Sequence, residues 1–281
     1  MKIHSSHYRI IFFSAIIISV FALFPFASYA SSLITDSTSL SSDTSYLTPR
    51  ESNISVELDT LSEKFNYKQF IVPGLFMVSG LVGAIDYNNG LNRSVNDAFT
   101  DLSDGSKCKL DEYLRFLPSA SHLLLGTVGV KSKHNFKERL LISATSHAAM
   151  LILGYGTKFI VKEQRPDMSN NHSFPSGHVA LAFTGAELLR SEYGTTYGIA
   201  GYAVATTVAF LRLYNNKHWF NDILMGAGIG ILSAKIGNWM LPINRKLFKI
   251  NDKNNRCSTV AITPTYNMVD RALGVSVYAV F

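Results

Sequence analysis

The stretch Ser173-Phe174-Pro175-Ser176-Gly177-His178 decides how the central part of this chain folds. The apolar run 179–189 follows it and is typical of a helix with proline in its first turn. A helix start presents unpaired N–H groups and the positive end of the helix dipole. Gly177 leaves its amide open to an approaching anion, and Ser176 adds a hydroxyl donor. The stretch therefore predicts an anion-binding helix start.

A second signal lies upstream, where Lys158 and Arg165 are seven residues apart. This spacing places both cations on one face of a helix, about two turns apart. Pro166 disfavours helical geometry at Arg165, so we expect the helix to end there with its guanidinium group beside the anion site.

A third signal lies downstream and consists of Arg212, His218 and Asp222. His218 and Asp222 are four residues apart, so the carboxylate can accept a hydrogen bond from one ring nitrogen and leave the other free as a nucleophile. Arg212 offers a second guanidinium fork for phosphate oxygens. In contrast, we expect His122 and His147, each alone on a predicted helix, to be structural.

In this order and spacing, the three signals resemble the motifs of the type 2 phosphatidic acid phosphatase superfamily, which also contains bacterial nonspecific acid phosphatases and vanadium haloperoxidases. The resemblance extends over roughly Leu140 to Leu241 and rests on about ten positions. One position departs from the pattern, because the family usually has a small residue where this chain has Leu211. We expect this change to affect local packing and not the chemistry.

The resemblance implies a phosphoryl transfer in two steps that needs no metal and no cofactor. It implies that His218 attacks phosphorus to form a phosphohistidine and that Asp222 fixes the tautomer of His218. His178 would protonate the leaving oxygen and then activate water. The phosphate oxygens would be bound by Lys158, Arg165, Ser176, Gly177 and Arg212.

The composition fits one main domain with a large core: the chain has 281 residues, of which 47% are hydrophobic, and a net charge of +6. Excess positive charge can serve nucleic acid, anionic lipid or a phosphorylated substrate. No nucleic-acid-binding signature is present, so we expect no nucleic-acid partner. Basic residues outside the site gather at 131–139 and 245–256, where both solvated loops and a membrane surface would accommodate them.

The first 30 residues are typical of a secretory signal peptide, with an uncleaved anchor as the alternative. Lys2 and Arg9 precede the apolar run 10–26, and Ser28-Tyr29-Ala30 offers small residues where a signal peptidase cleaves. Residues 31–68 are rich in Ser, Thr and Asp, so we expect a mostly irregular arm.

Residues 69–241 are predicted to form an all-α domain, an antiparallel bundle of about six helices. Its apolar segments are 70–85, 114–130, 140–161, 179–189, 197–211 and 223–241. The glycines at 226, 228 and 230 have no strand before them, so they predict close helix packing and not a phosphate loop.

Two architectures remain open: an exported helical domain that rests on or partly in the membrane, and an integral protein with six spans. Segment 179–189 is short for a span and contains Glu187. The basic segments would lie at the bundle end opposite the motifs, which favours spans. Six spans starting at 70–85 conflict with a cleaved signal. Both architectures place the site at the periplasmic face of the inner membrane.

Residues 242–257 are predicted to be a basic linker, and residues 258–281 alternate as in a β-hairpin. A final strand that ends in Phe is typical of outer-membrane barrels, but one hairpin cannot close a barrel. We expect the hairpin to pack on the bundle or on a partner chain. Cys108 and Cys257 could form one disulfide or remain two thiols.

The function that these features predict is hydrolysis of a lipid phosphate in the bacterial envelope, with a phosphorylated lipid and the membrane surface as partners. Among the family's substrates, lipid A phosphate comes first, followed by polyprenyl pyrophosphate and phosphatidylglycerol phosphate. The alternatives are a soluble nonspecific acid phosphatase, a halide-oxidising enzyme that binds vanadate, and a non-catalytic lipid-binding protein of the envelope.

Overall fold

The structure, a computed structural model, describes residues 66–85, 90–250, 259–267 and 272–280. The predicted signal peptide 1–30, nearly all of the arm 31–68 and Cys257 lie outside the described residues. The leader, the arm and the disulfide therefore stay predictions.

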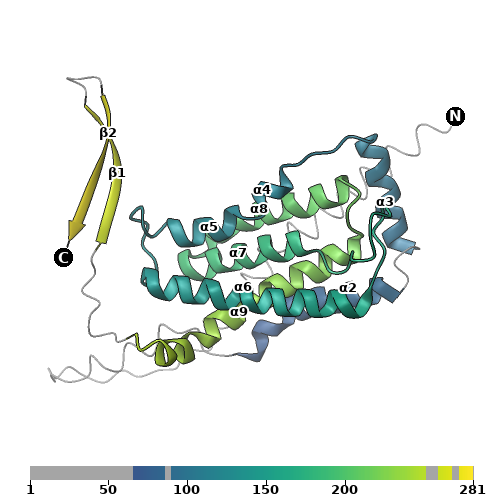
Figure 1. The fold of residues 1–281 in the computed structure, drawn as a ribbon, viewed down its shortest axis with the longest axis horizontal. Coiled ribbons are helices and arrows are strands. Elements are labelled where there is room, and N and C mark those ends of the chain that lie inside the picture. Colours follow the sequence, from purple (N-terminus) through teal and green to yellow (C-terminus); the bar gives the residue numbers. More distant parts are fainter. Residues whose placement is uncertain (1–65, 86–89, 251–258, 268–271, 281) are drawn as a thin grey trace, which may run out of the picture.

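Within residues 66–250, the described part of the chain is helical, as predicted. In chain order the helices are the 3-10 helix η2 (Tyr67–Phe70), α2 (Ile71–Ile85), α3 (Gly90–Ser103), α4 (Asp111–Leu114), α5 (Leu117–Leu124), α6 (Phe136–Val161), α7 (Gly177–Tyr193), α8 (Thr195–Tyr214) and α9 (Phe220–Leu247). Figure 1 shows α5 to α9 running side by side with α2 along the bundle. Helix α3 was not predicted, and segment 114–130 forms only the short α5, which begins at Leu117 with Pro118 in its first turn.

Helix α7 is the central element, because it packs against α5, α6, α8 and α9. Val179, Phe183 and Leu188 on α7 are fully buried. Burying an apolar side chain of this size stabilises a fold by about 1.5–3 kcal/mol. Since α7 begins at the predicted anion site, the packing that holds this helix also holds the site.

The close packing predicted for the glycines of α9 is confirmed. A Cβ atom at Gly226 would lie 2.7 Å from the carbonyl oxygen of Ser176, and one at Gly230 would lie 2.5 Å from that of Ala180. These distances are far below van der Waals contact, so only glycine lets α9 approach α7 this closely.

Helix α9 continues to Leu247, six residues beyond the predicted end of the helical domain at Leu241, with Pro242 inside the helix. Contacts with α6 hold these last turns. Asn244 donates to the hydroxyl of Thr145 at 2.8 Å, and Arg245 pairs with Glu138 at 2.6 Å. The end of α9 therefore lies beside the start of α6, at the bundle end opposite the motifs.

Three described helices are long and apolar enough to cross a membrane: Tyr67–Ile85, which combines η2 and α2, then α6 and α9. Only α9 is mostly buried inside the bundle. The outer faces of the other two carry exposed large apolar side chains, among them Ile71, Leu75, Val82, Ile152, Phe159 and Ile160. Exposed apolar surface of this extent supports association with a membrane.

The C-terminal strands β1 (Thr259–Asn267) and β2 (Ala272–Val280) pair antiparallel, from Thr259 opposite Val280 to Asn267 opposite Ala272. Residues 268–271, which would form the predicted turn, lie outside the described residues. The terminal hairpin as a unit therefore stays a prediction.

Candidate active site

The two upstream cations come from the end of α6 and from the loop that follows it. The prediction that this helix ends at Arg165 was wrong, because α6 ends at Val161 and Lys162 takes a left-handed conformation with φ 47°. The loop carbonyls find donors outside the helix: Ser173 N–H donates to Glu163 O at 2.9 Å, and the Trp219 indole donates to Gln164 O at 2.7 Å. These tertiary hydrogen bonds replace the helical ones.

Lys158 and Arg165 nevertheless reach the same cavity. The ammonium group of Lys158 donates to the carbonyl oxygens of His172 at 2.7 Å and Pro175 at 3.0 Å. The guanidinium group of Arg165 donates to the side chain of Asn170 at 3.1 Å. Each cation is held through part of its donor set and retains donor capacity for an anion.

Helix α7 begins at Gly177, with Ser176 as its N-cap residue. Pro175 lies just before the cap and not in the first turn as predicted, because Ser176 has an extended backbone. Ser176 N–H donates to Asp222 O at 3.1 Å, which ties the start of α7 to α9. The buried hydroxyl of Ser176 has no hydrogen-bond partner in the described part of the chain. An open helix start with a spare hydroxyl is suited to bind an anion.

His218 and Asp222 make the predicted pair. Nδ1 of His218 lies 3.1 Å from Oδ2 of Asp222, and both side chains are almost fully buried. The same carboxylate oxygen accepts from Trp219 N–H at 2.9 Å and from the Ser173 hydroxyl. Burial lowers the pKa of His218 to about 3, although Asp222 opposes this shift. The ring is therefore neutral at physiological pH, with Nε2 on the cavity side.

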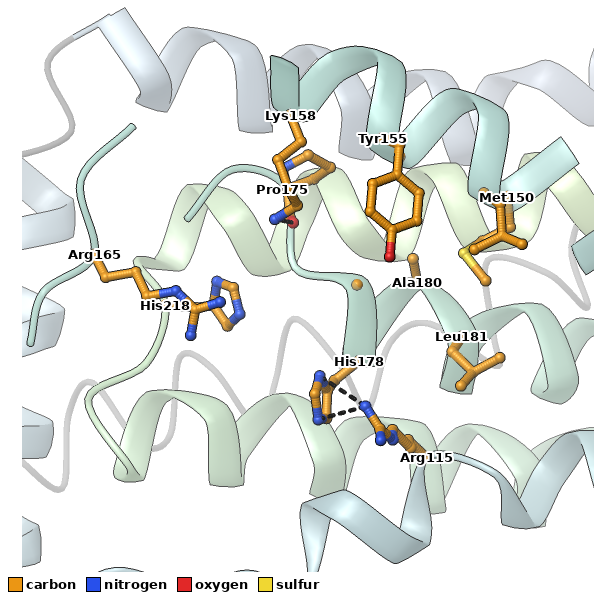
Figure 2. A pocket seen from close by; sticks show the side chains of 13 residues that line it. Arg115, Met150, Tyr155, Lys158, Arg165, Pro175, His178, Ala180, Leu181 and His218 are labelled. Atoms are coloured by element: carbon orange, nitrogen blue, oxygen red, sulfur yellow. Dashed lines mark hydrogen bonds between the residues drawn. The ribbon is translucent and has the colours of Figure 1, made fainter. Parts of the chain in front are cut away.

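His178 lies at the first turn of α7, and its ring lies beside Arg115 (Figure 2). Its Nε2 atom lies 2.8 Å from the Arg115 guanidinium and 3.1 Å from a carboxylate oxygen of Glu112. Burial and the charge of Arg212 lower the pKa of His178 to about 4, whereas the hydrogen bond with Glu112 opposes this shift. An anion in the cavity would favour the protonated ring in the same way as Glu112 does.

Arg212 is buried and already paired. Its guanidinium donates to Asp111 at 2.8 Å, and the amide of Asn215 donates to the other oxygen of Asp111 at 3.2 Å. Arg212 Nε is buried without a partner among the described residues. Arg212 does not line the cavity, but its charge lowers the pKa of both His178 and His218.

The cavity beside these residues has a volume of about 300 Å³. Figure 2 shows its two ends, with Arg165, Lys158, His218 and His178 around the polar end. The apolar wall comes from α6 and α7 and consists of Met150, Leu151, Gly154, Tyr155, Ala180 and Leu181. The cavity can thus accept an anionic group at one end and a hydrocarbon group at the other.

One set of described side chains could hold a metal ion, because ligand atoms of Asp111, Glu112 and His178 lie within 4.8 Å of one another. Asp111 is already paired with Arg212, and His178 with Arg115. Carboxylate and imidazole ligands in this number would suit a divalent cation only after these contacts had opened.

Five of the predicted residues line the cavity, namely Lys158, Arg165, Gly177, His178 and His218. Ser176, Asp222 and Arg212 are buried and do not line the cavity. Sequence reasoning missed Arg115, Glu112 and Glu163, which contact the predicted residues. Glu163 lies two residues before Arg165, and this proximity could have drawn attention to it. No signal marked α4.

Comparisons with known proteins agree with the motifs. Residues 139–246 match the family model described as the PAP2 superfamily. The chain is 35% identical over 136 residues to the lipid A 1-phosphatase of Porphyromonas gingivalis, covering 47% of this chain and 31% of the relative. It is 28% identical over 106 residues to the undecaprenyl-diphosphatase of Sulfolobus acidocaldarius, covering 32% and 52%. The chain thus spans about a third and about half of these two relatives.

Among solved structures, the chain is similar to a transmembrane PAP2 type phosphatidylglycerolphosphate phosphatase from Bacillus subtilis. The identity is 20%, the TM-score is 0.43, and the match covers 66% of this chain and 99% of the other. The family match spans the segment that carries all three motifs, from α6 to the end of α9. Through these residues, the chain is similar to the PAP2 superfamily.

Proposed function

We propose that this protein is a metal-independent lipid phosphatase that works through a phosphohistidine intermediate. The observation that carries this proposal is the neutral His218 ring, with Nδ1 held by Asp222 at 3.1 Å and Nε2 at a cavity surrounded by cations. A neutral, oriented imidazole beside bound phosphate is a competent nucleophile.

In the first step, Nε2 of His218 attacks phosphorus in line, and the bond between phosphorus and the ester oxygen breaks. His178 gives its proton to the leaving oxygen. Lys158, Arg165 and the amide of Gly177 bind the non-bridging oxygens, where negative charge is concentrated. Asp222 stabilises the positive charge that develops on the His218 ring.

In the second step, His178 takes a proton from water, and the oxygen of this water attacks the phosphorus of the phosphohistidine. The P–N bond breaks, phosphate leaves, and His218 returns to its neutral form. Each proton that His178 gives in the first step is recovered in the second. No other acid or base is needed.

The shape and composition of the cavity support a lipid substrate. Its apolar wall on α6 and α7 continues from the cationic end, and large exposed apolar side chains lie on the outer face of α6. A phosphate at the polar end would place a hydrocarbon group along this wall. Lipid A phosphate is our first choice, supported by the P. gingivalis relative, and polyprenyl pyrophosphate follows, supported by the S. acidocaldarius relative.

We place this reaction at the periplasmic face of the inner membrane, after export through the signal segment 1–30. The basic loop before α6 and the end of α9 lie at the opposite end of the bundle, which supports this orientation. We also propose that the terminal strands form a hairpin outside the catalytic domain.

The test of the proposal is phosphate release by the purified full-length protein in EDTA. Lipid A, polyprenyl pyrophosphate and an aryl phosphate are compared, with His218→Ala as the blank. Release from one lipid that is abolished in His218→Ala supports the proposal. Release from the aryl ester alone points to a nonspecific acid phosphatase, and no release from any of them points to a non-catalytic lipid-binding protein.

The lipid preference has a separate test in α6. Gly154 lines the cavity, whereas Gly156 does not, and a Cβ atom would meet nothing within 4 Å at either position. Gly154→Leu therefore narrows the cavity along its apolar wall, and Gly156→Leu is the matched control. We expect Gly154→Leu to raise KM for the lipid and not for the aryl phosphate. An equal effect of both variants would contradict the proposed binding wall.

A further inference from the structure

Glu163 is a buried acid behind the proposed nucleophile, and the mechanism above gives it no role. It lies in the loop after α6 and is only 3% exposed. The Asn221 side-chain amide donates to its two oxygens, at 3.0 Å and 3.4 Å. Because Asn221 directly precedes Asp222 in the first turn of α9, this contact brings Glu163 beside the carboxylate that orients His218.

The two oxygens of Asp222 have unequal environments. Oδ2 accepts three hydrogen bonds, from His218, Trp219 and Ser173. Oδ1 is buried and has no donor among the described residues when every acid is taken as ionised. An unpaired acceptor inside a protein is costly, and buried polar atoms almost always have a partner. The site therefore lacks one donor.

Glu163 is placed to supply this donor, because its carboxyl group is within hydrogen-bonding reach of Asp222. Two ionised carboxylates cannot share a hydrogen bond, but an acid and a carboxylate can. Burial and the charge of Asp222 both raise the pKa of Glu163, and the hydrogen bond from Asn221 and the charge of Lys158 only partly oppose this. The neutral acid is thus the form that fits the surroundings.

We infer that Glu163 is a positioning residue: as a neutral acid it donates a hydrogen bond to Oδ1 of Asp222 and so fixes the carboxylate that orients His218. The role in turnover rests on the proposed function, whereas the hydrogen bond itself does not. With Oδ1 held from one side and Oδ2 from the other, the Asp222 carboxylate cannot rotate away from the His218 ring.

The neutral state of Glu163 also protects the nucleophile. A second negative charge beside Asp222 would favour protonation of His218, and a protonated ring cannot attack phosphorus. A shared proton leaves one net negative charge in the pair. One carboxylate is then enough to orient the ring, and the ring stays neutral.

The kinetic test compares Glu163→Gln with Glu163→Ala in the full-length protein. A glutamine amide can donate to Asp222 and still accept from Asn221, so we expect kcat to stay within about threefold of the wild-type value. Alanine removes the donor, and we expect kcat to fall roughly 10- to 100-fold with KM nearly unchanged. If Glu163→Gln lost as much kcat as Glu163→Ala, an ionised carboxylate would be required and the inference would be overturned.

The spectroscopic test does not depend on turnover. The infrared spectrum at neutral pH should contain the carbonyl band of a protonated carboxylic acid that Glu163→Gln removes. Glu192 provides the matched control, since it is equally buried but paired with His134 at 2.7 Å. Glu192→Gln should leave the band in place. If Glu163→Gln had the same carboxylic acid band as the wild-type protein, the inference would be overturned even if the enzyme were active.

The two measurements separate the inference from the proposed function. A wild-type protein that shows the band but releases no phosphate keeps the hydrogen bond and contradicts the lipid phosphatase. An active wild-type protein without the band supports the lipid phosphatase and contradicts the hydrogen bond from Glu163. Should Glu163→Ala fail to fold, the infrared comparison of Glu163→Gln with Glu192→Gln still decides.

Discussion

Asp222→Asn is the substitution whose effect follows most directly from the site. Asp222 is fully buried and does not line the cavity, so we expect it to act on substrate mainly through His218, which it contacts directly. Asparagine has nearly the same shape, and its single oxygen can accept the hydrogen bonds that Oδ2 of Asp222 accepts, although its NH2 group would stand in place of Oδ1. What it lacks is the negative charge opposite the ring as the P–N bond forms.

The size of this loss can be estimated from the contact of 3.1 Å between Nδ1 of His218 and Oδ2 of Asp222. Hydrogen bonds to charged groups contribute about 1.5–3 kcal/mol, against about 0.5–1.5 kcal/mol for neutral ones. The developing cation on the ring adds to this difference, because the contact is buried. We therefore expect a loss of about 2–3 kcal/mol in the transition state, which corresponds to a fall in kcat of roughly 30- to 150-fold.

The assay is steady-state phosphate release, with kcat and KM measured separately. KM should change little, because the phosphate contacts themselves remain. Asp167→Asn is the control, since Asp167 pairs with Lys217 at 2.6 Å in a half-buried contact of the loop after α6 and makes no hydrogen bond or ion pair with His218 in the described part of the chain. The reasoning is refuted if Asp222→Asn leaves kcat unchanged, or if it raises KM at constant kcat.

Three further predictions concern stability, each measured by thermal unfolding of the purified protein in detergent. Gly230→Ala should destabilise the protein by about 1–3 kcal/mol, because the new Cβ would meet the backbone of α7 at 2.5 Å. The control Gly74→Ala, where the Cβ would meet nothing within 4 Å, should stabilise the protein by about 0.5–1 kcal/mol. Equal effects of the two variants would show that α7 and α9 are not in close contact. Burial lowers the pKa of His218 to about 3, below its value in the unfolded chain. Between about pH 6.5 and pH 3 the unfolded chain therefore binds a proton that the folded protein does not. The free energy of unfolding should fall as the pH drops through this range, by up to about 1.4 kcal/mol per pH unit. His218→Asn should flatten that dependence, and parallel curves for the two proteins would contradict the assignment. Glu187→Gln should lower the free energy of unfolding by about 3 kcal/mol, because this fully buried carboxylate accepts hydrogen bonds from two cations and a tyrosine. Asp97→Asn, in an exposed ion pair, should lower it by less than about 1 kcal/mol. Similar losses in the two variants would argue against these buried contacts of Glu187.

The sequence was sufficient to predict five of the residues that line the cavity. The spacing of Lys158 and Arg165 placed both cations at one site, although the reason given was wrong, since α6 ends before Arg165. The result holds because the loop is fixed by hydrogen bonds from Trp219 and Ser173. The pair of His218 and Asp222 was predictable because its geometry is local, within one helical turn.

The residues that sequence reasoning missed reach the site through tertiary packing. Glu112 and Arg115 come from the polar segment around α4, which packs beside α7 and α8, and no periodicity in the sequence marks it. Arg212 was predicted to bind phosphate, and this stays a prediction; its contact with the distant Asp111 was not predicted. The role inferred for Glu163 depends on its burial, which local sequence does not reveal.

The membrane relationship was only partly predictable. Six apolar segments were expected, and three described helices have the length and composition of membrane spans. Helix α7 lies in the centre of the bundle and carries buried polar groups such as Glu187, so its mean hydropathy underestimates how apolar its surroundings are. Hydropathy reports composition, whereas burial depends on what surrounds each helix.

The measurement that tests the central claim most directly is the capture of the covalent intermediate. The protein is mixed with substrate carrying labelled phosphate and quenched in alkali, in which phosphohistidine survives, and the peptide that contains residue 218 is analysed. The account predicts label on His218 in the wild-type protein and none in His218→Ala. Label on another residue, or sustained phosphate release by His218→Ala, would contradict it.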